Sequence, residues 1–123
     1  MLSVSTKEIS TEHRLLMDEQ SLKFFQENLQ HSRAATSNIA QLIIESRVDI
    51  SLLQEPYTVN NKIAGIPKSM RTYVCGEGRR RAAIIISNNN VDATLISQLS
   101  NEDCVVMEIH HKEKKFFISG LVL

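Results

Sequence analysis

The sequence has few of the features that mark a specialised class of protein. Tryptophan is absent, only two cysteines occur, and the 14 lysines and arginines equal the 14 aspartates and glutamates. A net formal charge of zero excludes a global field that attracts nucleic acid, although a local basic patch can act where the total cannot. Cys75 and Cys104 have no CxxC spacing and no histidines placed as zinc partners, which indicates free thiols in a reducing compartment.

Long hydrophobic runs are also absent. The run at residues 82–86 is far too short to cross a bilayer, and Met1 opens a polar segment without the apolar stretch of a secretory signal. We therefore expect an intracellular protein without membrane contact. An apolar share of 42% in 123 residues is enough to build the core of one folded domain.

Residues 1–20 carry charges of both signs and little apolar periodicity, so we interpret them as an N-terminal extension with at most a short helix near residues 12–18. The domain itself is expected to span residues 21–123. We see no fixed-period repeat or low-complexity tract that would divide it.

The domain begins with a pattern typical of a βαβ-like unit. Residues 22–29 have the period of a strand, and residues 33–47 have that of a helix with Ser32 as its N-cap. A second strand follows at residues 49–54. This order predicts an α/β (α+β) fold class.

The remainder of the domain is rich in short β segments. After a turn-rich loop, five segments separated by polar turns predict an antiparallel β-meander in one sheet. They are residues 71–75, 82–87, 91–96, 104–109 and 115–121.

Two polar side chains stand where predicted strands end. Asn28 lies at the end of the first strand, and Glu55 follows the second directly before Pro56. Carboxylate and amide oxygens are hard ligands that suit Mg²⁺, which acts on phosphate by polarising and orienting it. A solvated strand-end glutamate and a turn asparagine are the alternative interpretations, and each residue taken alone favours them.

Two segments at this separation carry a more specific pattern. Residues 24–36 read Phe-Phe-Gln-Glu-Asn-Leu-Gln-His-Ser-Arg-Ala-Ala-Thr, and residues 48–57 read Val-Asp-Ile-Ser-Leu-Leu-Gln-Glu-Pro-Tyr. Together with residues 63–67 and 80–86, they resemble the endonuclease domain of non-LTR retrotransposons. That domain belongs to the endonuclease/exonuclease/phosphatase superfamily, which also contains abasic-site endonucleases and DNase I. The resemblance covers roughly residues 22–123.

The resemblance implies a four-layered α/β sandwich, of which this chain supplies the N-terminal part. It implies that Asn28 is the active-site asparagine and Glu55 the metal-binding glutamate, so that both are catalytic and both serve Mg²⁺. In the family these residues serve Mg²⁺-dependent nicking of one DNA strand, a hydrolysis that exposes a 3′-hydroxyl to prime reverse transcription. DNA would then be the partner, and the nucleus the compartment if that function is retained.

Several parts of the family's pattern are missing. The family completes its site with a tyrosine, an Asp-x-Asn motif and a Ser-Asp-His motif, which do general-base and phosphate-orienting work. Neither motif occurs in this sequence, and neither does a reverse transcriptase. We expect His110 and His111 to be solvated turn residues, and Glu27 departs from the apolar residue usual at its place. We therefore expect a truncated domain that is inactive by itself and binds Mg²⁺ weakly.

Three consecutive arginines form the dense basic patch of the sequence. Arg79, Arg80 and Arg81 follow a short Gly-Glu-Gly turn and could hold DNA phosphates without reading sequence, or could be a solvated hairpin end. Arg33, in the first turn of the predicted helix, could face the same groove or the solvent. Tyr57 could line the cleft or cap the core.

Two alternative functions stay open. The first is a non-catalytic remnant that binds nucleic acid or another protein. Half a sandwich would leave an apolar sheet face uncovered and residues 115–121 as an unprotected edge strand, which favours self-association. The second is a phosphatase or exonuclease of the same superfamily, which fits the His-Ser-Arg-Ala-Ala segment less well.

Overall fold

The strand–helix–strand unit predicted at the start of the domain is present. In a computed structural model that describes residues 2–4 and 22–122, β2 (Phe24–Asn28) and β3 (Ile50–Gln54) are parallel neighbours joined by α1 (Arg33–Ser46). Ser32 caps the helix as predicted, because its Oγ accepts the Ala35 N–H at 3.1 Å.

The first sheet has the strand order β2-β3-β7-β6, with β6 at Arg71–Tyr73 and β7 at Ala82–Ile86. Both β6 and β7 run antiparallel to their neighbours. The central strands β3 and β7 are buried at every position, which explains the unbroken apolar run of β7. A small hairpin, β4 (Thr58–Val59) with β5 (Lys62–Ile63), follows β3.

The second sheet is antiparallel throughout and has the order β1-β10-β9-β8. Burial alternates along its two long strands, as expected for strands with one face on the core. Its elements are β1 (Leu2–Val4), β8 (Asp92–Leu95), the short 3₁₀ helix η1 (Ser97–Leu99), β9 (Cys104–His111) and β10 (Lys114–Leu121).

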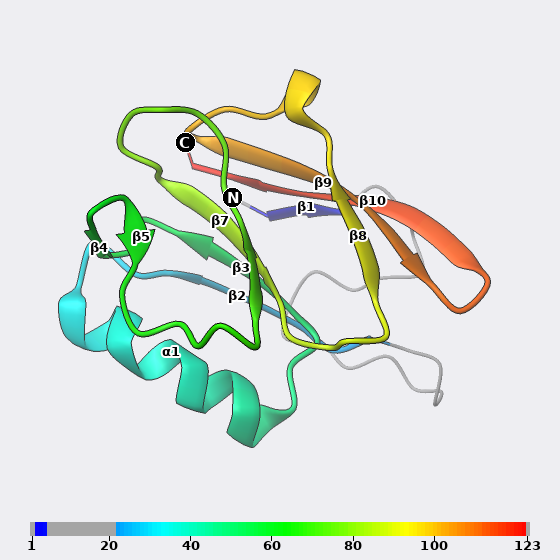
Figure 1. The fold of residues 1–123 in the computed structure, drawn as a ribbon, viewed down its shortest axis with the longest axis horizontal. Helices are drawn as coiled ribbons and strands as arrows, with labels where there is room; N and C mark the ends of the chain where they lie inside the picture. Colours follow the sequence, from blue (N-terminus) through cyan, green and yellow to red (C-terminus); the bar gives the residue numbers. More distant parts are fainter. Residues whose placement is uncertain (1, 5–21, 123) are drawn as a thin grey trace.

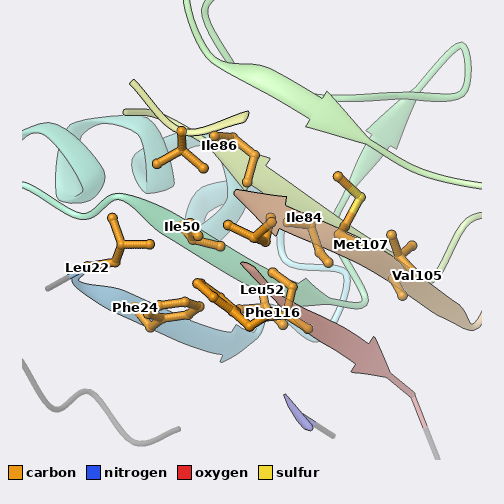
Figure 2. Close-up of a cluster of buried hydrophobic side chains, with 13 residues drawn as sticks. Leu22, Phe24, Ile50, Leu52, Ile84, Ile86, Val105, Met107 and Phe116 are labelled. Atoms are coloured by element: carbon orange, nitrogen blue, oxygen red, sulfur yellow. The ribbon is translucent and has the colours of Figure 1, made fainter. Parts of the chain in front are cut away.

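The two sheets lie face to face and α1 covers the other face of the first sheet (Figure 1). Figure 2 shows the core between the sheets, where Phe24, Leu52 and Ile84 from one sheet meet Met107 and Phe116 from the other. A second core joins α1 to the first sheet through Ile39, Ile43, Leu53 and Ile85. The described residues therefore form three of the layers of the expected sandwich, and the fold is of the α+β class.

Two sequence predictions about the β-rich half were wrong. The meander is divided between two sheets, because β6 and β7 join the first sheet and only β8–β10 form the second. Strand β10 is not the outermost strand of its sheet, because Leu2–Val4 pairs with its residues Ile118–Gly120. The apolar faces of the two sheets cover each other, which removes the uncovered face on which the prediction of self-association was based. Self-association itself stays a prediction.

The N-terminal boundary of the domain stays a prediction. Although residues 1–20 were expected to be an extension, Leu2–Val4 contributes a strand to the second sheet. The short helix expected near residues 12–18 lies outside the described residues. Within the part of the chain that is described, no helix is long and apolar enough to cross a membrane.

Neighbouring isoleucines on α1 give a matched test of the second core. Ile43 is 1% exposed and Ile44 is 63% exposed. We expect Ile43→Ala to lower the free energy of unfolding by about 2–5 kcal/mol, because it leaves a cavity against the sheet. The same change at Ile44 should alter it by less than about 0.5 kcal/mol. Urea denaturation followed by circular dichroism measures both values, and equal losses would contradict this packing.

Candidate functional site

Strand pairing brings the predicted strand-end residues to one edge of the first sheet. The parallel register places Asn28 beside Gln54, the residue before Glu55. Strand β7 runs the other way and begins where β3 ends, with Ala82 paired to Gln54. The Glu55 N–H consequently donates to the Arg81 carbonyl at 2.7 Å. Glu55 and Arg81 therefore face each other just beyond their strands.

Both carboxylate oxygens of Glu55 are occupied by donors. Arg81 donates from Nε to Oε1 at 2.8 Å and from its NH2 group to Oε2 at 3.4 Å. His31 places Nε2 at 3.1 Å from Oε2. The Arg81 hydrogen bonds hold the pKa of Glu55 below its usual range, with partial burial opposing them and His31 adding to them. The same contact raises the pKa of Arg81.

His31 links Glu55 to Arg79. The Arg79 NH2 group lies 2.8 Å from Nδ1 of His31. A guanidinium has no acceptor atom, so Nδ1 must accept and the ring proton must be on Nε2, where it is donated to Glu55. A continuous series of contacts thus runs from Arg79 through His31 and Glu55 to Arg81, which also lies 3.4 Å from Asp103. We call these five residues the strand-end network.

The backbone around the network is held in an uncommon conformation. Gln30, His31 and Glu55 have φ values of 50°, 58° and 53°, in the left-handed region that non-glycine residues seldom adopt. Asn28 Oδ1 accepts the Gln30 N–H at 2.8 Å, and the Glu55 carbonyl accepts the His31 N–H at 2.7 Å. Such conformations cost on the order of 1 kcal/mol each and persist only where the surroundings impose them. The Asn28 side chain therefore stabilises the turn after β2, and this turn carries His31.

The loop of residues 76–81, which we call the basic loop, is anchored to the segment before β9. The carboxylate of Glu102 accepts the N–H groups of Glu77 at 3.0 Å and Gly78 at 3.3 Å. Arg80 donates to the carbonyls of Gly76 and Asn61. These contacts fix the direction in which the loop presents its arginines.

The three arginines differ in how far their charge is balanced. Arg81 is paired with Glu55, whereas the side chain of Arg79 contacts a ring nitrogen of His31 and that of Arg80 donates to backbone carbonyls. Among the described ion pairs, none involves Arg79 or Arg80. Of the three, Arg79 and Arg80 are therefore the arginines outside these ion pairs, and Arg80 also interacts electrostatically with Glu102.

A cavity of about 320 Å³ adjoins the network beside the β4–β5 hairpin. Its wall includes Pro56 and Arg80, the immediate neighbours of Glu55 and Arg81. Three of its lining residues are cationic, Lys62, Lys68 and Arg80, and none is acidic. Positively charged side chains thus continue from the basic loop along the wall of this cavity.

The other predicted site residues lie outside the network. Arg33 is exposed at the first position of α1. Tyr57 is half-buried, and its backbone N–H donates to Thr36 Oγ1 at 3.0 Å. The prediction for His111 was wrong: β9 extends through this residue, so the alternation of the strand turns its side chain inward, where it is 8% exposed. His110 is exposed, as expected, and lies 3.5 Å from Glu108.

The side chains at Glu55 and Asn28 do not fit a Mg²⁺ ion as they are arranged. Both oxygens of Glu55 face donors, one of them a cation at 2.8 Å, and Asn28 Oδ1 already accepts a backbone N–H. The described residues contain no group of three or more His, Cys, Asp or Glu that could hold a metal. Mg²⁺ at these residues stays a prediction of the sequence resemblance, which this geometry does not favour.

Two members of the network were not predicted from the sequence. His31 lies three residues after Asn28 in the same strand–helix turn, and that proximity was a usable signal. Asp103 precedes β9 of the second sheet, and it comes to Arg81 because the N–H groups of Arg81 and Ala82 donate to the carbonyl of its neighbour Glu102 at 2.8 and 3.1 Å. Nothing in its local sequence indicates that contact.

Two glycines of the basic loop give a matched pair of substitutions. Gly76 has φ +88°, and a Cβ there would lie 2.3 Å from Cδ of Glu102. If Glu102 moved aside, its hydrogen bonds to the loop would be lost. We expect Gly76→Ala to lower the free energy of unfolding by about 1 kcal/mol or more, and Gly78→Ala by less than about 0.5 kcal/mol, because a Cβ at Gly78 meets ordinary contacts. Chemical denaturation measures both, and a neutral Gly76→Ala would contradict the loop geometry.

The Glu55 pairing should appear in the pH dependence of stability. Because the folded pKa lies below the ordinary value of 4.5, the unfolded chain binds the proton more readily. Glu55 thus contributes stability that is complete above that value and is lost as the pH falls through the folded pKa. We expect the stability difference between wild type and Glu55→Gln to shrink as the pH falls through this range. The control is Glu113→Gln in the exposed β9–β10 turn, and a difference for Glu55→Gln that is independent of pH would contradict the pairing.

Comparison with solved structures finds this fold in the endonuclease domain of TRAS1, a telomere-specific non-LTR retrotransposon. The two share 23% sequence identity with a TM-score of 0.66, over 78% of this chain and 42% of that chain. This chain thus spans less than half of the length of that domain. Neither the protein-family models nor the curated proteins gave a match to the sequence.

Proposed function

We propose that this chain is part of a retrotransposon-type DNA endonuclease domain, and that by itself it binds the DNA backbone without nicking it. The observation that carries the proposal is the strand-end network, with Glu55 at the edge where parallel strands β2 and β3 end and with Arg79 beside it. Ligand sites in open α/β sheets lie at this edge. The sequence pattern around Asn28 and Glu55 and the fold shared with the TRAS1 domain support the same conclusion.

Charge at this edge suits a phosphodiester backbone. Arg79 and Arg80 make no ion pair among those described, and Lys62 and Lys68 extend the positive surface along the adjoining cavity. Cations on a loop hold phosphates by charge and hydrogen bonds, with no reading of base edges. Binding should therefore depend strongly on salt and little on sequence.

Cleavage requires groups that this network does not leave free. Hydrolysis of a phosphodiester needs a base for the attacking water and a group to stabilise the developing charge. Glu55 is neutralised by Arg81, and His31 has its Nδ1 facing Arg79 and its Nε2 proton facing Glu55. The described part of the chain thus supports binding rather than catalysis.

Charge removal in the arginine loop tests the binding. We expect Arg79→Ala/Arg80→Ala to weaken binding of a fluorescently labelled duplex about tenfold or more at low salt. It should also reduce the slope of log affinity against log salt by about 2, because two phosphate contacts are lost. Fluorescence anisotropy over a salt series measures both. The matched control is Lys112→Ala/Lys114→Ala, which removes two exposed charges from the tip of the β9–β10 hairpin and should bind as wild type does.

Two results would overturn the proposal in different ways. Absence of duplex binding by the wild-type chain at low salt would remove the binding role. Nicking of supercoiled plasmid in Mg²⁺ by the purified chain, abolished by Glu55→Ala, would show that the chain is catalytic by itself.

A further inference from the structure

We propose that the Arg81 guanidinium takes the place of a divalent cation at Glu55, so that the strand-end network excludes the metal and a phosphodiester is bound by positively charged side chains without one. The first half of this inference stands on the geometry of Glu55. The second half rests on the proposed DNA binding.

The guanidinium lies where a cation would bind. Its Nε and NH2 groups approach separate oxygens of Glu55 at 2.8 and 3.4 Å, the fork arrangement in which arginine binds a carboxylate. Nε2 of His31 approaches Oε2 at 3.1 Å. Each oxygen of the carboxylate thus already contacts a hydrogen-bond donor.

The backbone keeps this guanidinium in place. The Arg81 carbonyl accepts the Glu55 N–H at 2.7 Å, and the Arg81 N–H donates to the Glu102 carbonyl at 2.8 Å. Asp103, at 3.4 Å, provides a second carboxylate for the same side chain. Arg81 and Glu55 are therefore tied together through backbone as well as side chain, and moving Arg81 away would leave Glu55 partly buried without its main partner.

A divalent cation competes poorly under these conditions. Mg²⁺ dehydrates reluctantly and relies on several oxygen ligands. Here it would find two carboxylates, Glu55 and Asp103, that both contact a fixed positive charge, and Asn28, whose Oδ1 already accepts a backbone N–H. Because like charges a few ångströms apart repel strongly in a partly dry site, a fixed guanidinium lowers the affinity for a second cation at the same carboxylate.

The metal half of the inference, that Arg81 excludes a divalent cation from Glu55, can be tested on the whole chain without DNA. Mn²⁺ serves as the probe. Bound Mn²⁺ broadens nearby amide signals in NMR spectra. We expect no selective broadening of the Glu55 and His31 amides in the wild type. In Arg81→Gln we expect selective broadening at these amides and an affinity for Mn²⁺ at least about tenfold higher, because the competing charge is gone. Adding Glu55→Gln to that variant should abolish the gain.

Matched variants separate the pairing from a general charge effect. Arg79→Gln removes a neighbouring positive charge that contacts His31 and not Glu55, so its Mn²⁺ titration should match that of the wild type. Selective broadening at Glu55 in the wild type would overturn the inference, whether or not Arg81→Gln folds. A folded Arg81→Gln without a gain would also overturn it.

The phosphodiester half of the inference is that DNA is bound without a metal ion. It is tested by comparing the affinity of the wild type for a labelled duplex in EDTA with that in millimolar Mg²⁺ at matched ionic strength. We expect the two affinities to agree within about twofold, because the contacts are counterion exchanges with guanidinium groups. A strong increase with Mg²⁺ would overturn this half. If the chain binds no duplex in either buffer, this half fails with the proposed function, whereas the Mn²⁺ titration still decides the metal half.

Discussion

Burial of β3 and β7 on both faces is the constraint on which the rest of the structure depends. No residue of either strand is more than 4% exposed, and together they supply apolar side chains to both cores. Because the strands are antiparallel, the end of one meets the start of the other. The first residues beyond them, Glu55 and Arg81, emerge together from a dry interior into a half-exposed edge, where a charge pair is screened less than on open surface.

In the network at this edge, the acidic side chains balance part of the positive charge. Glu55 is satisfied by Arg81 and His31, Asp103 lies near Arg81, and Glu102 binds the loop backbone. Positive charge that faces outward therefore comes from Arg79, Arg80 and the lysines of the cavity. The three arginines were expected to behave alike, either on DNA phosphates or at a solvated hairpin end, whereas in the structure Arg81 is paired with Glu55 and the other two lie outside the described ion pairs.

Local pattern predicted most of the elements, and tertiary contacts explain what it did not predict. The change of period from 2 to 3.6 located β2, α1 and β3 within a residue or two, and Ser32 gave the start of the helix. The division of the meander was in principle visible, because β7 is apolar throughout whereas β9 and β10 alternate. The partner of Glu55 was not predictable in this way, since Arg81 is 26 residues away and any of three adjacent arginines carries the same charge. Whether a carboxylate at a strand end receives a metal or a guanidinium depends on strand register, which local pattern does not specify.

The pairing of β1 with β10 has a consequence for how this domain can be joined to other sequences. Leu2 lies opposite Gly120, so the two ends of the described chain meet at one margin of the second sheet (Figure 1). A short linker could close the chain there, and new ends could be opened in the exposed β9–β10 turn without cutting either core. The segment from Leu2 to Gly120 could likewise be inserted into a loop of a host protein, because its entry and exit would lie at neighbouring points.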